Sequence, residues 1–113
     1  MSYNIEGTNQ FEKEFKKLAK KYPSLKSDIA NLIVSIQVHP TQGIEILKNC
    51  FKIRFTIKSK GRGKSGGARL ITFVQIQEKR VLLLTLYDKS ERETVQDHVL
   101  RSILENHIIT HKI

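Results

Sequence analysis

The chain has 113 residues, of which 39% are hydrophobic, and we expect it to form a single domain that spans residues 1–113. Its 20 Lys and Arg residues outnumber its 11 Asp and Glu residues, for a formal net charge of +9 at pH 7. A surplus of this size favours a polyanionic partner, nucleic acid above all.

One cysteine and the pattern of apolar residues exclude several classes of protein. Cys50 has no second cysteine to pair with, which excludes an internal disulfide and a Cys-rich zinc site and indicates a reducing compartment such as the cytoplasm. The first residues lack a basic region followed by an apolar run, and no apolar run could cross a bilayer. We therefore expect neither a secretory signal nor a membrane partner.

Two helices are predicted near the start of the chain. Across residues 9–22 the apolar side chains repeat on one helical face, with Thr8 as a suitable N-cap and Pro23 ending the helix. Ser24 is the predicted N-cap of a second helix with the same spacing, which stops before Pro40. Because the connector is so short, the two helices should form a helical hairpin.

The middle of the chain predicts an antiparallel sheet. Residues 77–79 form a polar turn between the last two strands, and the final strand is apolar on both faces, as in a strand covered on both sides. Residues 1–6 fit an additional short strand. The predicted strands of the main sheet are residues 45–47, 51–58, 69–76 and 80–87.

The C-terminal part predicts a third helix. Residues 90–93 have the Ser-x-x-Glu form of a capping box, and a broad apolar stripe follows them. This helix should either cover the second face of the sheet or bind a partner. The expected fold class is α+β: a two-helix hairpin packed on an antiparallel sheet of three to five strands, plus a C-terminal helix.

Positive charge is concentrated in the middle of the chain. No acid lies between Glu45 and Glu78, and residues 51–58 alternate between apolar and polar side chains, so cations should project from the face opposite the helical hairpin. The cations of this stretch are Lys48, Lys52, Arg54, Lys58, Lys60, Arg62, Lys64 and Arg69.

Two interpretations of these cations remain open. Like charges on one strand face repel one another, which costs folding free energy unless a polyanion offsets it. The alternative is that acids elsewhere, such as Glu91 or Glu93, neutralise them. The glycine-rich residues 61–67 could likewise cradle phosphates or form a solvated hairpin loop, but they do not form a nucleotide-binding P-loop, because Lys58 stands where that motif needs glycine.

Such a surface could also cleave RNA without a metal. The 2′-hydroxyl of RNA can attack its own phosphate if one group accepts its proton, another protonates the leaving 5′-oxygen and cations stabilise the phosphorane. A crowded lysine can act as the base, and Tyr87 is a second candidate for proton transfer. Cys50 is expected to be a small structural residue rather than a nucleophile. The histidines, expected to be surface or helix-packing residues without metal-ligand spacing, are His39, His98, His107 and His111.

The sequence contains three distinctive segments: C-F-K-I-R-F at residues 50–55, S-K-G-R-G-K-S-G-G-A-R-L-I-T-F at residues 59–73 and L-L-T-L-Y-D-K-S-E at residues 83–91. These segments resemble the RelE/ParE toxin superfamily, and most closely its HigB-like branch. The resemblance implies the RelE fold and a type II toxin that cleaves mRNA on the ribosome and inhibits translation. It implies an endoribonuclease without metal or cofactor that a cognate antitoxin protein silences.

The resemblance also implies roles for individual residues. Lys52, Arg54 and Arg69 match the basic residues that RelE toxins use at the scissile phosphate, and Tyr87 matches the tyrosine of the HigB-like Tyr-x-Lys ending. These four are the expected catalytic residues. The expected RNA- and ribosome-binding residues are Lys48, Lys58, Lys60, Arg62, Lys64 and Lys89.

The sequence departs from RelE at two positions of the last segment. Ser90 stands where RelE has an arginine, and Gln96 aligns with a tyrosine of RelE. The identity of the proton donor is therefore open, with Tyr87 as the candidate. Because ParE proteins share the fold and inhibit gyrase, a gyrase inhibitor without nuclease activity is an alternative function, and a non-catalytic RNA-binding module is another.

Overall fold

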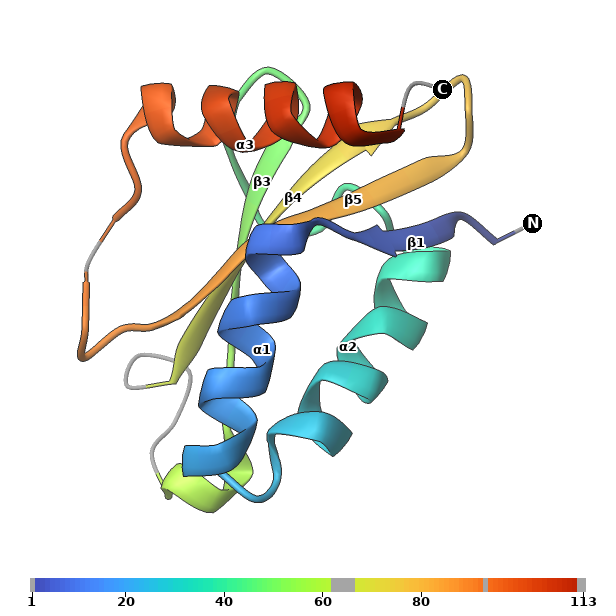
Figure 1. Ribbon diagram of the computed structural model, residues 1–113. Helices are drawn as coiled ribbons and strands as arrows, with labels where there is room; N and C mark the ends of the chain where they lie inside the picture. Colours follow the sequence, from blue (N-terminus) through green and yellow to red (C-terminus); the bar gives the residue numbers. More distant parts are fainter. Residues whose placement is uncertain (1, 62–66, 93, 112–113) are drawn as a thin grey trace.

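The computed structural model describes residues 2–61, 67–92 and 94–111, with side chains up to residue 108 (Figure 1). The described residues form three α-helices, one short 3₁₀ helix (η1) and five strands. In chain order they are β1 (Asn4–Gly7), α1 (Asn9–Lys21), α2 (Leu25–Val38), β2 (Ile44–Leu47), β3 (Cys50–Phe55), η1 (Lys58–Lys60), β4 (Ala68–Gln75), β5 (Arg80–Asp88) and α3 (Asp97–His111).

The strands form one mixed sheet. Their order is β1-β5-β4-β3-β2, and every neighbouring pair is antiparallel except β1 and β5, which are parallel. The expected α+β class, with a helical hairpin, a mainly antiparallel sheet and a C-terminal helix, is confirmed. The parallel pairing of β1 was not predicted from the sequence.

The two faces of the sheet have separate hydrophobic clusters. One cluster packs beneath α1 and α2 and includes Ile53 and Phe55 of β3, so the predicted apolar side of this strand does face the hairpin. The other cluster joins Cys50, Ile71 and Leu84 of the sheet to Leu100 of α3. The C-terminal helix therefore covers the second face, and β5 is covered on both sides, as its apolar sequence predicted.

The first helical cap follows the prediction, and the second does not. The Thr8 hydroxyl accepts a hydrogen bond from the backbone N–H of Phe11, at 3.1 Å. Ser24 makes no such cap bond to α2. Its hydroxyl instead donates to Asp28 Oδ2 at 2.7 Å and accepts from the Ser59 N–H at 2.8 Å, which attaches η1 to the helical hairpin.

Two other boundaries differ from the prediction. The strand expected at residues 51–58 ends at Phe55, and Lys58 begins η1 with its backbone N–H donating to Asp28 Oδ2 at 3.1 Å. The capping box predicted at residues 90–93 does not start the last helix, which begins at Asp97. The N–H of Ser90 donates instead to Asp88 Oδ1 at 3.0 Å, so Ser90 belongs to a turn after β5.

Helix α1 also covers the edge of β5. Strand β1 pairs with β5 only as far as Leu83. Beyond that residue the backbone N–H of Leu86 donates to Glu14 Oε1 at 3.0 Å, and the Thr85 hydroxyl donates to the same oxygen at 2.6 Å. Edge groups that β1 does not reach are thereby satisfied. Among the described helices, none has the length and apolar character needed to cross a bilayer.

Candidate functional site

Three predicted catalytic residues lie side by side across the sheet. The strand register places Arg54 of β3 opposite Arg69 of β4, and Arg69 opposite Tyr87 of β5. Residues directly opposite each other in an antiparallel pair project from the same face. Tyr87 belongs to the cluster on the α3 side, so this cross-strand row lies on the face away from the helical hairpin.

The members of the cross-strand row differ in their access to solvent. Arg54 is exposed, whereas Arg69 is 4% exposed and Tyr87 is 2% exposed. An Nη1 hydrogen of Arg69 is donated to the carbonyl of Ala68 at 3.1 Å. Arg54 is thus the member that a ligand in solution can touch first, while Arg69 adds positive charge beneath it.

Tyr87 is held in its protonated form. Burial raises the pKa of its hydroxyl, and the positive charges of Arg69 and Arg92 only partly oppose that effect. Within the described residues the buried hydroxyl has no hydrogen-bond partner. A protonated phenol of this kind can give a proton to a leaving oxygen.

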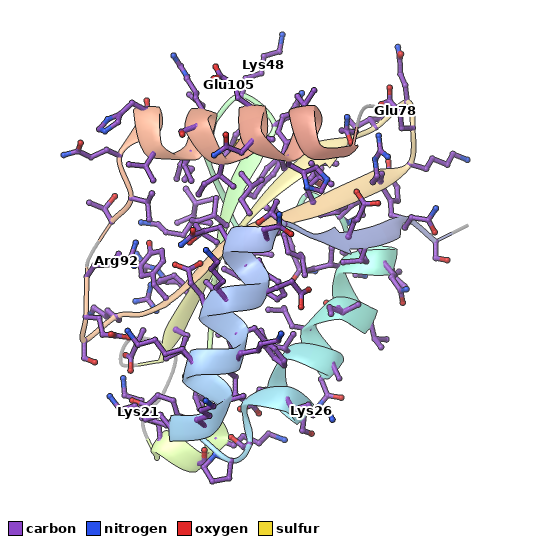
Figure 2. The ribbon with its side chains drawn as sticks, viewed as in Figure 1. Lys21, Lys26, Lys48, Glu78, Arg92 and Glu105 are labelled. Carbon is purple, nitrogen blue, oxygen red and sulfur yellow. The ribbon has the colours of Figure 1, made fainter. Side chains whose placement is uncertain are left out.

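Arg92 is a neighbour of the row that the sequence reasoning missed. Its guanidinium carbon lies 5.3 Å from the centre of the Tyr87 ring, and its Nη2 lies 3.6 Å from Glu14 Oε2. Figure 2 shows Arg92 on the segment that leads from β5 to α3. The expectation of a helix from Ser90 onward concealed this contact, because a helix there would have directed the side chain elsewhere.

Lys52 lies at the border between the row and α3. It is half-buried, two residues before Arg54 on β3, and it stands opposite Ile71, which packs against α3. Neither Lys52 nor Arg54 has an ion pair with an acid of the described residues. The prediction of strand cations without carboxylate partners therefore holds for this pair within the part of the chain that the structure describes.

For Lys60 the alternative interpretation is correct, because a carboxylate pairs with this cation. Its Nζ lies 2.6 Å from Asp88 Oδ1, and the side chain of Asp88 is fully buried. The Tyr22 hydroxyl donates to the other carboxylate oxygen, also at 2.6 Å. The partner is neither of the two acids considered from the sequence, because the end of β5 lies beside the start of β4 and brings Asp88 to the loop.

Asp88 is a carboxylate stabilised by its hydrogen bonds. Burial alone would raise its pKa, but the bonds from Lys60, Tyr22 and Ser90 outweigh that effect and hold the pKa well below the usual range. The hydrogen bond to Asp88, together with burial, raises the pKa of Tyr22. Lys60, Tyr22 and Asp88 thus form a hydrogen-bonded network that joins the η1 loop, α1 and β5.

Three of the remaining predicted binding residues lie in the described part of the chain. Lys48 is exposed in the turn before β3, at the end of that strand away from Arg54. Lys58 is exposed in η1, and Lys89 is half-buried with its backbone N–H donating to the Gly67 carbonyl at 3.2 Å. The other two predicted residues, Arg62 and Lys64, lie outside the described residues.

Cys50 and the described histidines lie outside the row. Burial raises the pKa of the Cys50 thiol to about 11, which makes it a poor nucleophile. His107 packs between α3 and β1, with Nε2 3.0 Å from Glu6 Oε2, while His39 and His98 are exposed. The described residues contain no group of three His, Cys, Asp or Glu side chains arranged to bind a metal.

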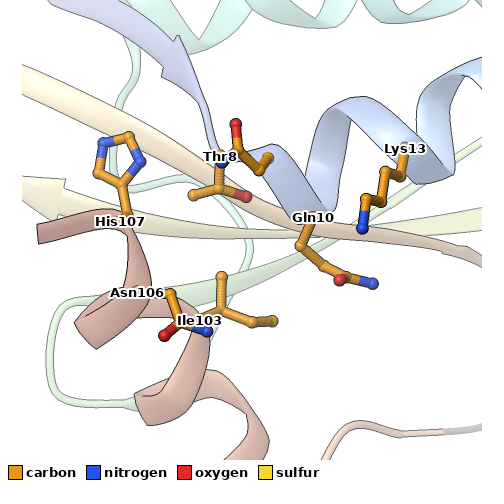
Figure 3. Close-up of a pocket in the computed structure, with 7 residues that line it drawn as sticks. Thr8, Gln10, Lys13, Ile103, Asn106 and His107 are labelled. Atoms are coloured by element: carbon orange, nitrogen blue, oxygen red, sulfur yellow. The ribbon is translucent and has the colours of Figure 1, made fainter. Parts of the chain in front are cut away.

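A cavity of about 350 Å³ lies between the start of α1 and α3. Figure 3 shows the residues that line the cavity, and none of them is a predicted site residue. Its lining is Thr8, Asn9, Gln10, Lys13, Ile103, Asn106 and His107.

Comparison with solved structures identifies the fold. A mutant of E. coli toxin RelE in the free state matches with a TM-score of 0.63 and 16% identity over 94% of this chain and 98% of that one. The RelBE2 toxin–antitoxin complex from Mycobacterium tuberculosis matches with a TM-score of 0.56 and 15% identity over 78% and 99%.

A third structure, the E. coli RelE mutant in complex with an antitoxin RelBc peptide, has a TM-score of 0.50 and 19% identity over 84% of this chain and 100% of that one. No protein-family model and no curated protein matches the sequence. At these identities the likeness is one of structure, and it agrees with the resemblance found in residues 50–91: the chain has the fold of the RelE toxins.

Proposed function

We propose that this protein is the toxin of a type II toxin–antitoxin system and that it cleaves mRNA on the ribosome without a metal or cofactor. The observation that carries the proposal is the cross-strand row, in which an exposed arginine, a buried arginine and a protonated tyrosine are adjacent on one face of a RelE fold. Positive charge next to a proton donor is what cleavage by the substrate's own 2′-hydroxyl requires.

In the proposed reaction each member of the row has a distinct role. Arg54 binds the scissile phosphate, and Arg69 stabilises the charge of the phosphorane that forms when the 2′-oxygen attacks phosphorus. Tyr87 protonates the 5′-oxygen as the P–O5′ bond breaks, which leaves a 2′,3′-cyclic phosphate and a 5′-hydroxyl end.

The base that accepts the 2′-proton is a residue of β3 in this proposal. Lys60 is a poor candidate because its Nζ is engaged by Asp88, 2.6 Å from Oδ1. Lys52, without a carboxylate partner in the described residues and two positions from Arg54, is the lysine that the arrangement favours.

A protein antitoxin is part of the same proposal. Two of the similar structures are a toxin–antitoxin complex and a toxin bound to an antitoxin peptide. We therefore expect this chain to be neutralised in the cytoplasm by a protein partner, with mRNA and the ribosome as its targets.

Expression in a bacterium tests the proposal. We expect mRNA 5′ ends that follow the reading frame of translated messages, and we expect them to disappear with Arg54→Ala. DNA breaks with intact messages would contradict the proposal in favour of a gyrase inhibitor. If the folded protein is neither toxic nor able to cleave messages, the remaining interpretation is a non-catalytic RNA-binding module.

A further inference from the structure

The outward side of α1 is a second basic surface. Five lysines of this helix are exposed, and no acid occurs in the sequence from Lys16 to Lys26. Counting charges along the chain does not reveal this surface, because acids elsewhere balance these lysines in the total. We call the five the α1 lysine face: Lys13, Lys16, Lys17, Lys20 and Lys21.

Within the described residues, no lysine of the α1 lysine face forms an ion pair. The exposed Glu12 lies at the start of the helix, one turn before Lys16. Glu14, which lies among them in the sequence, is turned toward β5, where it accepts hydrogen bonds from Thr85 and Leu86 and approaches Arg92. Helical spacing of three and four residues places the lysines along one side, while Phe11 and Leu18 are buried on the other.

The α1 lysine face ends beside the η1 loop. The Lys21 Nζ lies 5.3 Å from the centre of the Tyr22 ring, and the Lys60 Nζ lies 5.9 Å from the same ring. Figure 1 shows η1 next to the end of α1, and Figure 2 labels Lys21 there. Tyr22 therefore links the end of the lysine face to the loop that begins at η1.

We propose that the α1 lysine face binds the phosphate backbone of structured RNA, independently of base sequence, as a surface separate from the cross-strand row. Lysine ammonium groups act as point charges that meet phosphates from many directions, and such contacts position a protein without reading bases. The inference rests on the proposed function in one respect: if the protein acts on the ribosome, ribosomal RNA is the structured RNA at hand.

A membrane surface fits the face less well. Basic amphipathic helices bind lipid by burying their apolar side in the bilayer, and the apolar side of α1 is already packed in the core. A protein partner also fits less well, because stable protein interfaces need buried aromatic or aliphatic anchors. The exposed large hydrophobic residues of the described chain lie on other elements: Val34, Val38, Ile44, Ile76, Val99 and Ile108.

The test measures binding of the full chain to a short labelled RNA duplex over a series of salt concentrations, without ribosomes. One variant carries Lys13→Gln, Lys16→Gln, Lys17→Gln and Lys20→Gln, since glutamine keeps the helix propensity of lysine. Lys21 is left unchanged to preserve its contact with Tyr22. The matched control carries arginine at the same four positions, which retains the charge.

We expect the glutamine variant to bind at least tenfold more weakly at low salt, with a shallower dependence of log affinity on log salt, because each lost phosphate contact removes a little under one unit of slope. The arginine variant should bind as the unsubstituted chain does. If the glutamine variant fails to fold, as judged by its melting temperature, the pair Lys16→Gln and Lys20→Gln supplies the same comparison with a smaller expected change.

Unchanged affinity and slope in a folded glutamine variant would overturn the inference. So would a variant that loses binding to vesicles of anionic lipid while its RNA binding is unchanged. The proposed function fails separately, because it is judged by cleavage: an unsubstituted protein that binds the duplex through these lysines and cuts no message would overturn the proposed function alone.

Discussion

The cations of β3 and the cation of the neighbouring loop have opposite surroundings. Lys52 and Arg54 have no acid partner within the described residues, whereas Lys60 is held by a fully buried carboxylate, 2.6 Å from Asp88 Oδ1. All three belong to one basic stretch of the sequence. The structure, and not the sequence, shows that Lys52 and Arg54 are available to a ligand while Lys60 stabilises the protein.

The difference suggests that the β3 cations bind a ligand and that the Lys60–Asp88 pair stabilises the fold. An exposed arginine beside a second arginine costs folding free energy, which a bound polyanion can offset. A buried lysine–aspartate pair with additional hydrogen bonds instead keeps the η1 loop attached to β5. The substitutions below should therefore affect stability at one site and cleavage at the other.

Lys60→Met should have the largest effect on stability. It leaves the buried Asp88 carboxylate without its ion pair, and removing one partner of such a pair costs about 3 kcal/mol of unfolding free energy. Denaturant unfolding measures the loss. Lys48→Met, at an exposed turn position, is the control and should change the free energy by less than about 0.5 kcal/mol. Equal effects of both substitutions would contradict the structural role of Lys60.

Tyr87→Phe should lower cleavage by about 100-fold, because it removes the proposed proton donor. Stability should change little, since the hydroxyl has no hydrogen-bond partner in the described residues. The measurement is the rate of message cleavage on ribosomes together with the melting temperature. A folded Tyr87→Phe protein that cleaves at the normal rate would remove Tyr87 from the proposed mechanism.

Acid should weaken the network of Lys60, Tyr22 and Asp88 and thereby lower the free energy of unfolding. The pKa of Asp88 is lower in the folded chain than its usual value, so the stability it contributes is present above that usual value, about 3.9, and is lost as the pH falls below it. We expect the free energy of unfolding to decrease between about pH 5 and pH 2.

The same titration of Asp88→Asn should show a smaller decrease, by about 1 to 2 kcal/mol over this range. The variant is less stable at neutral pH, because it has lost the ionised partner of Lys60. Parallel curves for the two proteins would show that Asp88 does not supply the pH dependence.

Local patterns predicted the elements of the fold well. The helical stripe, Thr8 and Pro23 identified α1, and strict alternation identified β3 and its buried face. The two expected serine caps did not form, because both serines make other hydrogen bonds. Ser24 binds Ser59, and Ser90 turns its N–H to Asp88, so neither serine has the capping role that its local sequence suggested.

The site was predictable only in part, for a related reason. Charge clustering and the family resemblance indicated Arg54, Arg69 and Tyr87, and the strand register then placed the three together. No acid occurs near Lys60 in the sequence. Its pairing with Asp88 depends on the end of β5 lying beside the start of β4, which the sequence does not show. The α1 lysine face was overlooked because a sum over the chain does not reveal which charges share a surface.

Cleavage of a translated message by purified protein on purified ribosomes tests the central claim most directly. The comparison is between Arg54→Gln, in the cross-strand row, and Arg101→Gln, an exposed cation on α3. We predict that Arg54→Gln loses cleavage by about 100-fold with a melting temperature no lower than that of the unsubstituted protein, while Arg101→Gln cleaves normally. Cleavage at the normal rate by a folded Arg54→Gln protein would contradict the claim that the row is the site of RNA cleavage.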